Sequence, residues 1–235
     1  MKHSSVLGFG GAAAQTVGIL YVLVGVTHFL LPRAQLRGAG AISAVFLQSL
    51  SESSLVFSVH YWIVAVLSLL TIAVYLALLS LLRKHLDGPL CWAAALGLVG
   101  AALSALDFAY VGVEAPRLAR AFSNASPAAQ SVLATLGIPH IDPCFLAWGL
   151  MGIFGVAANT AALRHRLLPR ALGYIGVIGG VALLLVFAGS LLRSPRTIDA
   201  MVGLGGFVIG PVWYLWVGFV LRQEGRSATA AGNET

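Results

Sequence analysis

The chain has 235 residues, of which 59% are hydrophobic and only 9% are charged, whereas a soluble domain carries about 25% charged residues. This composition excludes an ordinary soluble domain and predicts an integral membrane protein. The net charge of +6 does not indicate nucleic-acid binding, because the basic residues stand at the ends of apolar runs, where they anchor and orient helices.

Six apolar segments are long enough to cross a bilayer, which takes about 20 residues. They are predicted at 11–31, 56–82, 89–113, 143–163, 171–192 and 200–221. The first is too long for a signal-peptide core and no small-residue cleavage site follows it, so we expect it to be retained. The predicted fold class is all-α, a polytopic bundle of six transmembrane helices that forms a single domain over 1–222. The small, polar residues 223–235 are predicted to form a disordered cytoplasmic tail.

The connections between the predicted spans alternate in length and charge. Those after the second and fourth spans are short and basic, RKHLDGP and RHRLLPR, and short loops weigh most in the positive-inside rule. Both termini are therefore predicted in the cytoplasm and the protein in the cell membrane. The connections after the first and third spans are long and have room for one or two short interfacial helices. In one of them, Ser126 as N-cap, Pro127 at the first position and Gly137 as the stop predict such a helix.

A faint internal repeat relates two of the predicted hairpins, 56–113 and 143–192. The stretch LGLVGAALSALDFA (96–109) aligns without gaps to IGVIGGVALLLVFA (175–188). The hairpins are either related or similar by chance, as Gly- and Leu-rich helices can be. The matched small residues allow helices to approach closely, so both segments are predicted to pack in the bundle interior. Asp107 aligns with Val186, so the architecture itself does not require an acid at that position.

Asp107 is the acidic residue that stands deepest in a predicted span. It lies about six residues inside the third span, roughly 9 Å deep at 1.5 Å per residue. Such a group usually faces the bundle interior or a water-filled cavity and finds a partner. The residues Ser104, Asp107, Tyr110 and Glu114 recur at helical spacing and form one polar stripe. This stripe lies toward the membrane face away from the termini.

These groups favour acid–base chemistry on a lipophilic substrate, such as an isoprenoid. In an apolar pocket Asp107 could keep its proton and act as a general acid. Glu114, nearer the water, would be a second carboxylate, and Tyr110 and His28 would assist. Tyr21, seven residues before His28, is the other member of a stripe on the first span. The predicted substrate-binding residues are mostly aromatic: Ser104, Phe108, Tyr21, Trp62, Trp148, Trp213 and Trp216.

Structural roles compete with the functional ones. Asp107 could make a structural hydrogen bond to a neighbouring helix, and the aromatic residues could form an interfacial belt. Asp142 followed by Pro143 is typical of a helix start, with Asp as the cap and Pro at the first position. Cys91 and Cys144 each begin an apolar run without CxxC spacing, so a disulfide between them stays open.

A haem- or metal-binding role is a further alternative, because His28, His60 and His140 all lie toward one membrane face. No HxxxH or ExxH pair is present, however, and no metal ligand and no cofactor are predicted. The predicted partners are the lipid bilayer and a lipophilic small molecule. A non-catalytic role as a small transporter, immunity protein or assembly factor also stays open.

Two stretches of the chain carry a resemblance to known proteins. RLLPRALGYIGVIGGVALLL and GPVWYLWVGFVLR resemble the end of an uncharacterised family of bacterial multispan membrane proteins, in which a basic loop, a proline and an aromatic-glycine helix precede a Trp-rich last span. That resemblance implies no activity. In size and in its acid-bearing helices the chain is also similar, as a class, to small integral-membrane terpene cyclases. This likeness implies that a carboxylate starts cyclisation by protonation, and no motif carries over residue by residue.

Overall fold

The computed structural model describes residues 3–36, 44–137 and 140–231. Six helices among these residues are long and apolar enough to cross a membrane, which confirms the predicted all-α bundle and makes the chain a multi-pass membrane protein. The first five spans are α1 (His3–Leu30), α3 (Leu55–Leu82), α4 (Gly88–Ser123), α6 (Leu146–Arg164) and α7 (Arg170–Leu191). The sixth joins α8 (Pro195–Val202), the π-helical segment η3 (Gly203–Ile209) and α9 (Gly210–Ala231).

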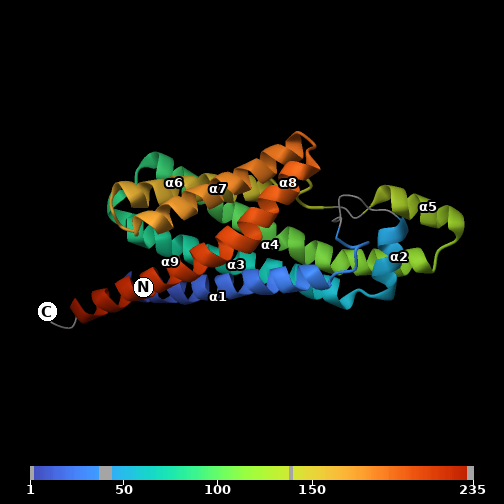
Figure 1. Cartoon of the computed structure of the whole chain (residues 1–235), viewed down its shortest axis with the longest axis horizontal. Helices are drawn as coiled ribbons and strands as arrows, with labels where there is room; N and C mark the ends of the chain where they lie inside the picture. The colour runs from blue at the N-terminus through green and yellow to red at the C-terminus, as the bar shows by residue number, and fades with distance from the viewer. Residues whose placement is uncertain (1–2, 37–43, 138–139, 232–235) are drawn as a thin grey trace.

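The spans pack in sequence around one hydrophobic core. Helix α1 lies between α9 and α3, α3 packs on α4, α4 on α6, and α6 on α7. The start of α1 and the end of α9 lie at one end of the bundle (Figure 1). The short helices α2 (Ala44–Glu52) and α5 (Pro127–Leu136) lie at the other end. The core between the spans includes the fully buried residues Val17, Val74, Phe154, Leu172 and Leu221.

Helix α4 continues ten residues beyond its predicted end at 113 and is 36 residues long, about 54 Å at 1.5 Å per residue. A hydrocarbon core is about 30 Å thick, so α4 extends well past the membrane. The extension keeps an apolar stripe that packs against α2 and the start of α3. Together they form a second core of buried residues: Leu31, Phe46, Leu47, Leu50, Phe57, Val111, Ala115, Ala119 and Phe122.

Pro116 lies inside α4 and cannot donate a backbone hydrogen bond to the carbonyl four residues earlier. That carbonyl belongs to Gly112, and it accepts a hydrogen bond from the Ser58 hydroxyl of α3 at 3.4 Å instead. The extension of α4 is therefore held to α3 at the point where its own ladder is interrupted.

Other predicted boundaries also differ from the structure. Helix α1 begins at His3 rather than at residue 11. Helix α6 begins at Leu146, so Pro143 lies before the helix and not at its first position. Residues 223–231, predicted as part of a disordered tail, continue α9, and the last four residues of that tail lie outside the described residues.

Glycines bring α4 and α7 close to α6, as predicted. A Cβ atom on Gly97 would lie 2.6 Å from Cβ of Phe154, and one on Gly100 would lie 2.5 Å from the carbonyl oxygen of Ala147. On α7, a Cβ atom on Gly176 would overlap the amide of Asn159. Both glycine-rich segments therefore pack in the bundle interior, with α6 between them.

Two local predictions can be compared with the structure directly. The short helix α5 begins after Ser126, whose hydroxyl accepts a hydrogen bond from the Ala129 nitrogen, and it ends at Gly137 with φ of 72°. That prediction is confirmed. Cys91 and Cys144 are both free and exposed, so the disulfide that the sequence left open is not formed.

Candidate functional site

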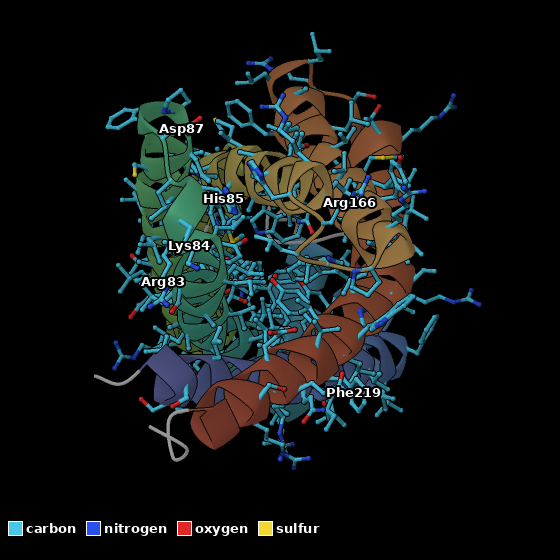
Figure 2. All side chains as sticks on the ribbon, turned by 90° about the vertical axis from the view of Figure 1, so that its left-hand side faces the viewer. Arg83, Lys84, His85, Asp87, Arg166 and Phe219 are labelled. Carbon is cyan, nitrogen blue, oxygen red and sulfur yellow. The ribbon has the colours of Figure 1, made fainter. Side chains whose placement is uncertain are left out.

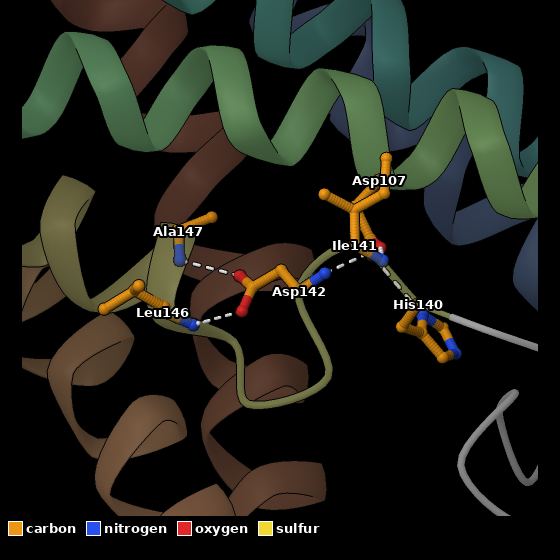
Figure 3. Close-up of polar contacts among 6 residues, drawn as sticks. All are labelled: Asp107, His140, Ile141, Asp142, Leu146 and Ala147. Atoms are coloured by element: carbon orange, nitrogen blue, oxygen red, sulfur yellow. Dashed lines mark hydrogen bonds and ion pairs between the residues drawn. The ribbon is translucent and has the colours of Figure 1, made fainter.

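Asp107 is buried on α4 and faces the connection that leads into α6 (Figure 3). Its Oδ1 accepts hydrogen bonds from the backbone nitrogens of Ile141 at 2.8 Å and Asp142 at 3.1 Å. Its Oδ2 lies 3.5 Å from Nδ1 of His140. The deep acid thus has partners, and they belong to a loop rather than to a neighbouring helix.

Asp142 extends this set of hydrogen bonds into α6. Its two carboxylate oxygens accept hydrogen bonds from the nitrogens of Leu146 at 2.8 Å and Ala147 at 2.7 Å. These are amides at the start of a helix, which have no partner within the helix. Asp142 therefore caps α6 as predicted, although from four residues before its first turn. Asp107 therefore accepts hydrogen bonds from the loop, and Asp142 accepts hydrogen bonds from the start of α6.

The polar stripe predicted on α4 exists, but its members contact different neighbours. The Ser104 hydroxyl lies 3.0 Å from that of Ser68 on α3. Glu114 forms an ion pair with Arg117 of its own helix, at 2.7 Å. Tyr110 is partly buried. The structure therefore does not assemble Asp107 and Glu114 as a pair of carboxylates.

A continuous chain of aromatic rings crosses the same end of the bundle. Neighbouring ring centroids in this chain are 5.3 to 6.3 Å apart. Five of the six spans contribute a ring, so this aromatic chain runs from η3 of the sixth span through α1, α3 and α4 to α6. The members, in order, are Phe207, His28, His60, Tyr61, Phe108, Trp148 and Phe145.

The other aromatic residues predicted to bind substrate lie elsewhere. Trp62 and Trp216 are exposed on the outside of the bundle. Trp213 is buried and its Nε1 donates to Oδ1 of Asn159 at 3.3 Å, which makes it a packing residue between α9 and α6. Tyr21 stacks on Tyr214 with centroids 5.5 Å apart.

His60 is held by a hydrogen bond across two spans. Its Nδ1 lies 2.8 Å from Oγ1 of Thr27, which is also 2.9 Å from the carbonyl oxygen of Leu23. A hydroxyl has one proton. When Thr27 donates it to Leu23, as threonines in helices do, it accepts from Nδ1–H of His60, and Nε2 of that ring is left as an acceptor. His28 lies beside it, with centroids 6.0 Å apart.

A groove of about 290 Å³ opens between α1 and the sixth span. Neither histidine lines it, but two of its lining residues, Phe29 and Phe207, contact the His28 ring. Phe207, which contacts the His28 ring, is in the π-helical segment η3, and such segments occur frequently at functional sites. Side chains on the α1 wall are exposed on the outside of the bundle, Phe29 by 80%, so the groove faces the lipid. Its lining residues are Tyr21, Val22, Gly25, Val26, Phe29, Phe207 and Pro211.

The three histidines that could have formed a haem or metal site do not converge. His28 and His60 are neighbours, whereas His140 contacts Asp107. Within the described residues, no three His, Cys, Asp or Glu side chains are grouped so that they could hold a metal ion.

Sequence reasoning named His60 only among the three histidines toward one membrane face, and it did not single out Thr27 or Phe207. One signal could have found the histidine pair, since both histidines stand near the same end of consecutive spans that turn back on each other. Nothing comparable in the sequence predicts the hydrogen bond between Thr27 and His60, because threonine is common in membrane helices.

Comparisons with known proteins place the chain in a family without giving it an activity. No curated protein and no solved structure matches it. The model of the family described as "Domain of unknown function (DUF4386)" matches residues 16–220. That range begins inside α1 and ends inside α9, so it includes the aromatic chain, the groove and both acids. The chain therefore belongs to the DUF4386 family.

Proposed function

We propose that this membrane protein binds a lipophilic molecule in the groove between α1 and η3 and acts on it by acid–base chemistry. The position of the groove carries the proposal. Its walls are apolar and aromatic, its outer side faces the lipid, and Phe207 in its wall contacts the ring of His28. Small-molecule sites combine such walls with a few placed polar groups.

The size of the groove favours an elongated ligand. At about 290 Å³ it lies near the lower limit of small-molecule pockets, which is about 300 Å³. One end of the molecule would lie in the groove and the rest in the surrounding lipid. An isoprenoid fits this description, since its chain is long and apolar and its head can form hydrogen bonds.

The histidine pair is the best candidate for the acid–base groups. Imidazole changes its protonation most readily among side chains near neutral pH. Thr27 fixes the ring of His60, and His28 stands between that ring and Phe207. Asp107 and Glu114 already have partners. We therefore assign the acid–base role to the two histidines instead. Cyclisation started by Asp107 as the proton donor has less support, because two backbone N–H groups already donate to its carboxylate.

Filling the groove tests the binding step. The variant Gly25→Leu adds a side chain at a lining position where a Cβ atom would lie 3.4 Å from the Phe207 ring. We expect the full-length protein, purified in nanodiscs from its host membrane, to retain a lipophilic compound that mass spectrometry detects and that Gly25→Leu loses. The control Gly8→Leu stands on the same helix, where a Cβ atom meets nothing within 4 Å. Equal retention by both variants would reject the groove as the site.

A non-catalytic role is the second candidate function, and the hydrogen bonds of Asp107 favour it. The two candidates separate once the bound compound is known. The wild-type protein and the variant His60→Gln are incubated with that compound, and its conversion is followed by mass spectrometry. Conversion by the wild-type protein that the variant lacks supports an enzyme. Binding without conversion by either protein supports a carrier or an assembly factor.

A further inference from the structure

Two short loops meet at the end of the bundle that carries the start of α1 and the end of α9. His85 belongs to the short helix η2 (Arg83–His85), between α3 and α4. His165 follows α6. Their rings stack with centroids 3.7 Å apart and an angle of 10° between the planes. The stack joins the loops of two separate hairpins into one surface.

This surface is strongly basic. The stacked pair has Arg83 and Lys84 on one side and Arg164 and Arg166 on the other, and all four side chains are exposed. Figure 2 looks onto this end and shows Arg83, Lys84 and His85 on one loop and Arg166 across from them. Both loops follow helices that are long and apolar enough to cross a membrane, so we expect the surface to lie at the level of the lipid headgroups.

No acid within the described residues neutralises these four cations. The acid closest to them in the sequence, Asp87, accepts a hydrogen bond from the Leu90 nitrogen at 2.9 Å and caps α4. The described residues have one Arg–carboxylate ion pair, Arg117 with Glu114, and a contact of His140 with Asp107 that becomes an ion pair when the imidazole is protonated. Neither includes one of these four cations.

Arg166 stands in a backbone conformation that usually takes glycine. Its φ is 57°, its nitrogen donates to the carbonyl of Leu163, and the next nitrogen, of Leu167, donates to the carbonyl of Ala162. This is the Schellman motif, in which glycine is the usual residue at the left-handed position. Arginine is less favourable there than glycine, and its exposed side chain adds a cation to the surface. Arg193 occupies the same position of the motif after the C-terminal end of α7, with φ of 50°. The loop that carries Arg166 precedes the N-terminal end of the same helix.

We infer that the two stacked loops bind the phosphate of an anionic phospholipid headgroup. Arginine and lysine side chains bind phosphate through charge-assisted hydrogen bonds, and membrane-surface basic clusters attract anionic lipids. A lipid is favoured over soluble phosphate because the cations lie at headgroup level, where lipid phosphates are abundant. This inference concerns the end of the bundle opposite the groove and does not depend on the proposed function.

Lipid retention by the full-length protein tests the inference. The protein is placed in nanodiscs of phosphatidylcholine with a minor fraction of phosphatidylglycerol, and native mass spectrometry measures the phosphatidylglycerol that stays bound. We expect wild-type protein to retain it preferentially. The triple variant Arg83→Gln, Lys84→Gln, Arg166→Gly should bind it roughly fivefold more weakly for each cation removed. Glycine suits the backbone at position 166, so folding of that loop is preserved.

The control is Arg193→Gly, which makes the same replacement in the same motif at the other end of α7. It should retain phosphatidylglycerol as the wild type does. A roughly fivefold loss in the control as well, the effect of any one surface cation, would overturn the site in favour of general surface charge. Full retention in the triple variant would overturn it outright. Inorganic phosphate that displaces the lipid at millimolar concentration would identify a soluble anion as the ligand instead.

The stack itself can be tested with His165→Ala, which leaves all four cations in place. Weaker retention is expected, because the two loops are no longer held together. Unchanged retention would reject a site shared by the loops.

Discussion

Asp107 on α4 and Asp142 before α6 are joined by a hydrogen bond of 3.1 Å, from the Asp142 nitrogen to Oδ1 of Asp107. The carboxylate of Asp142 in turn accepts hydrogen bonds from the first amides of α6. One buried acid thus binds the loop, and the second, which lies in that loop, binds the start of the helix. The position of α6 on α4 depends on both.

Replacing Asp107 separates this structural role from a catalytic one. Asp107→Ala leaves the backbone donors of Ile141 and Asp142 without their acceptor, at a cost of about 1–3 kcal/mol for each donor that stays buried. Asp107→Asn keeps an oxygen at that position and should cost much less. Thermal unfolding of the purified variants in one detergent measures the difference. An alanine variant as stable as the wild type would contradict this account.

The hydrogen bond between Thr27 and His60 makes a prediction about the imidazole tautomer. In the wild type, ¹⁵N NMR of labelled histidine should show His60 with its proton on Nδ1. Thr27→Val keeps the side-chain shape but removes the acceptor, so the signal should move toward the other tautomer. The matched control is Thr16→Val, because the Thr16 hydroxyl donates to the Ala12 carbonyl within its own helix. A shift of equal size in that control would show that the effect is not specific to the pair.

Close packing between α4 and α6 predicts a cost for any side chain at Gly100. A Cβ atom there would lie 2.5 Å from the Ala147 carbonyl oxygen and 2.9 Å from Cβ of Leu150. Gly100→Ala should therefore lower the free energy of unfolding by about 1–3 kcal/mol. Gly8→Ala, where a Cβ atom meets nothing within 4 Å, should instead be neutral or raise it by up to about 1 kcal/mol. Equal unfolding temperatures for the two variants would contradict the packing described.

Gln35 should hold α2 in place. It is 2% exposed, and its Nε2 donates to the carbonyl oxygens of Ser49 at 3.2 Å and Ser53 at 3.0 Å. Gln35→Leu removes these donors and should speed hydrogen exchange of the amides in α2, while those in α7 remain protected. The control Gln48→Leu removes an exposed contact to Glu52 on the surface of α2 and should leave exchange unchanged. Faster exchange throughout the protein would indicate global destabilisation instead.

The spans and α5 could be predicted because their signals are local. Apolar length defines a span, and Ser126 with Gly137 defines the ends of a short helix. The extension of α4 was missed because Glu114 and Arg117 end the apolar run, although Val111, Ala115 and Ala119 continue a stripe on the other side. Average hydropathy cannot separate these two faces.

The contacts around the candidate residues could be predicted only in part, because they join positions that are distant in the sequence. The depth of Asp107 follows from the sequence, but its partners lie more than 30 residues away in a loop whose path no periodicity gives. His28, Phe108 and Trp148 do lie at one end of the bundle, whereas Trp213 packs on Asn159. Phe207, which lines the groove, lies in a π-helical segment. The sequence of that segment, GLGGFVI, is equally compatible with an α-helix.

The ligand proposed for the groove would reach it from the bilayer by lateral diffusion, that is, from a two-dimensional solution. Occupancy would then follow the mole fraction of the ligand in the lipid rather than its concentration in water. A strongly partitioning molecule could fill the groove despite a weak intrinsic affinity. Detergent would dilute the same molecule and empty the groove, so the composition of the solubilised phase sets what is bound.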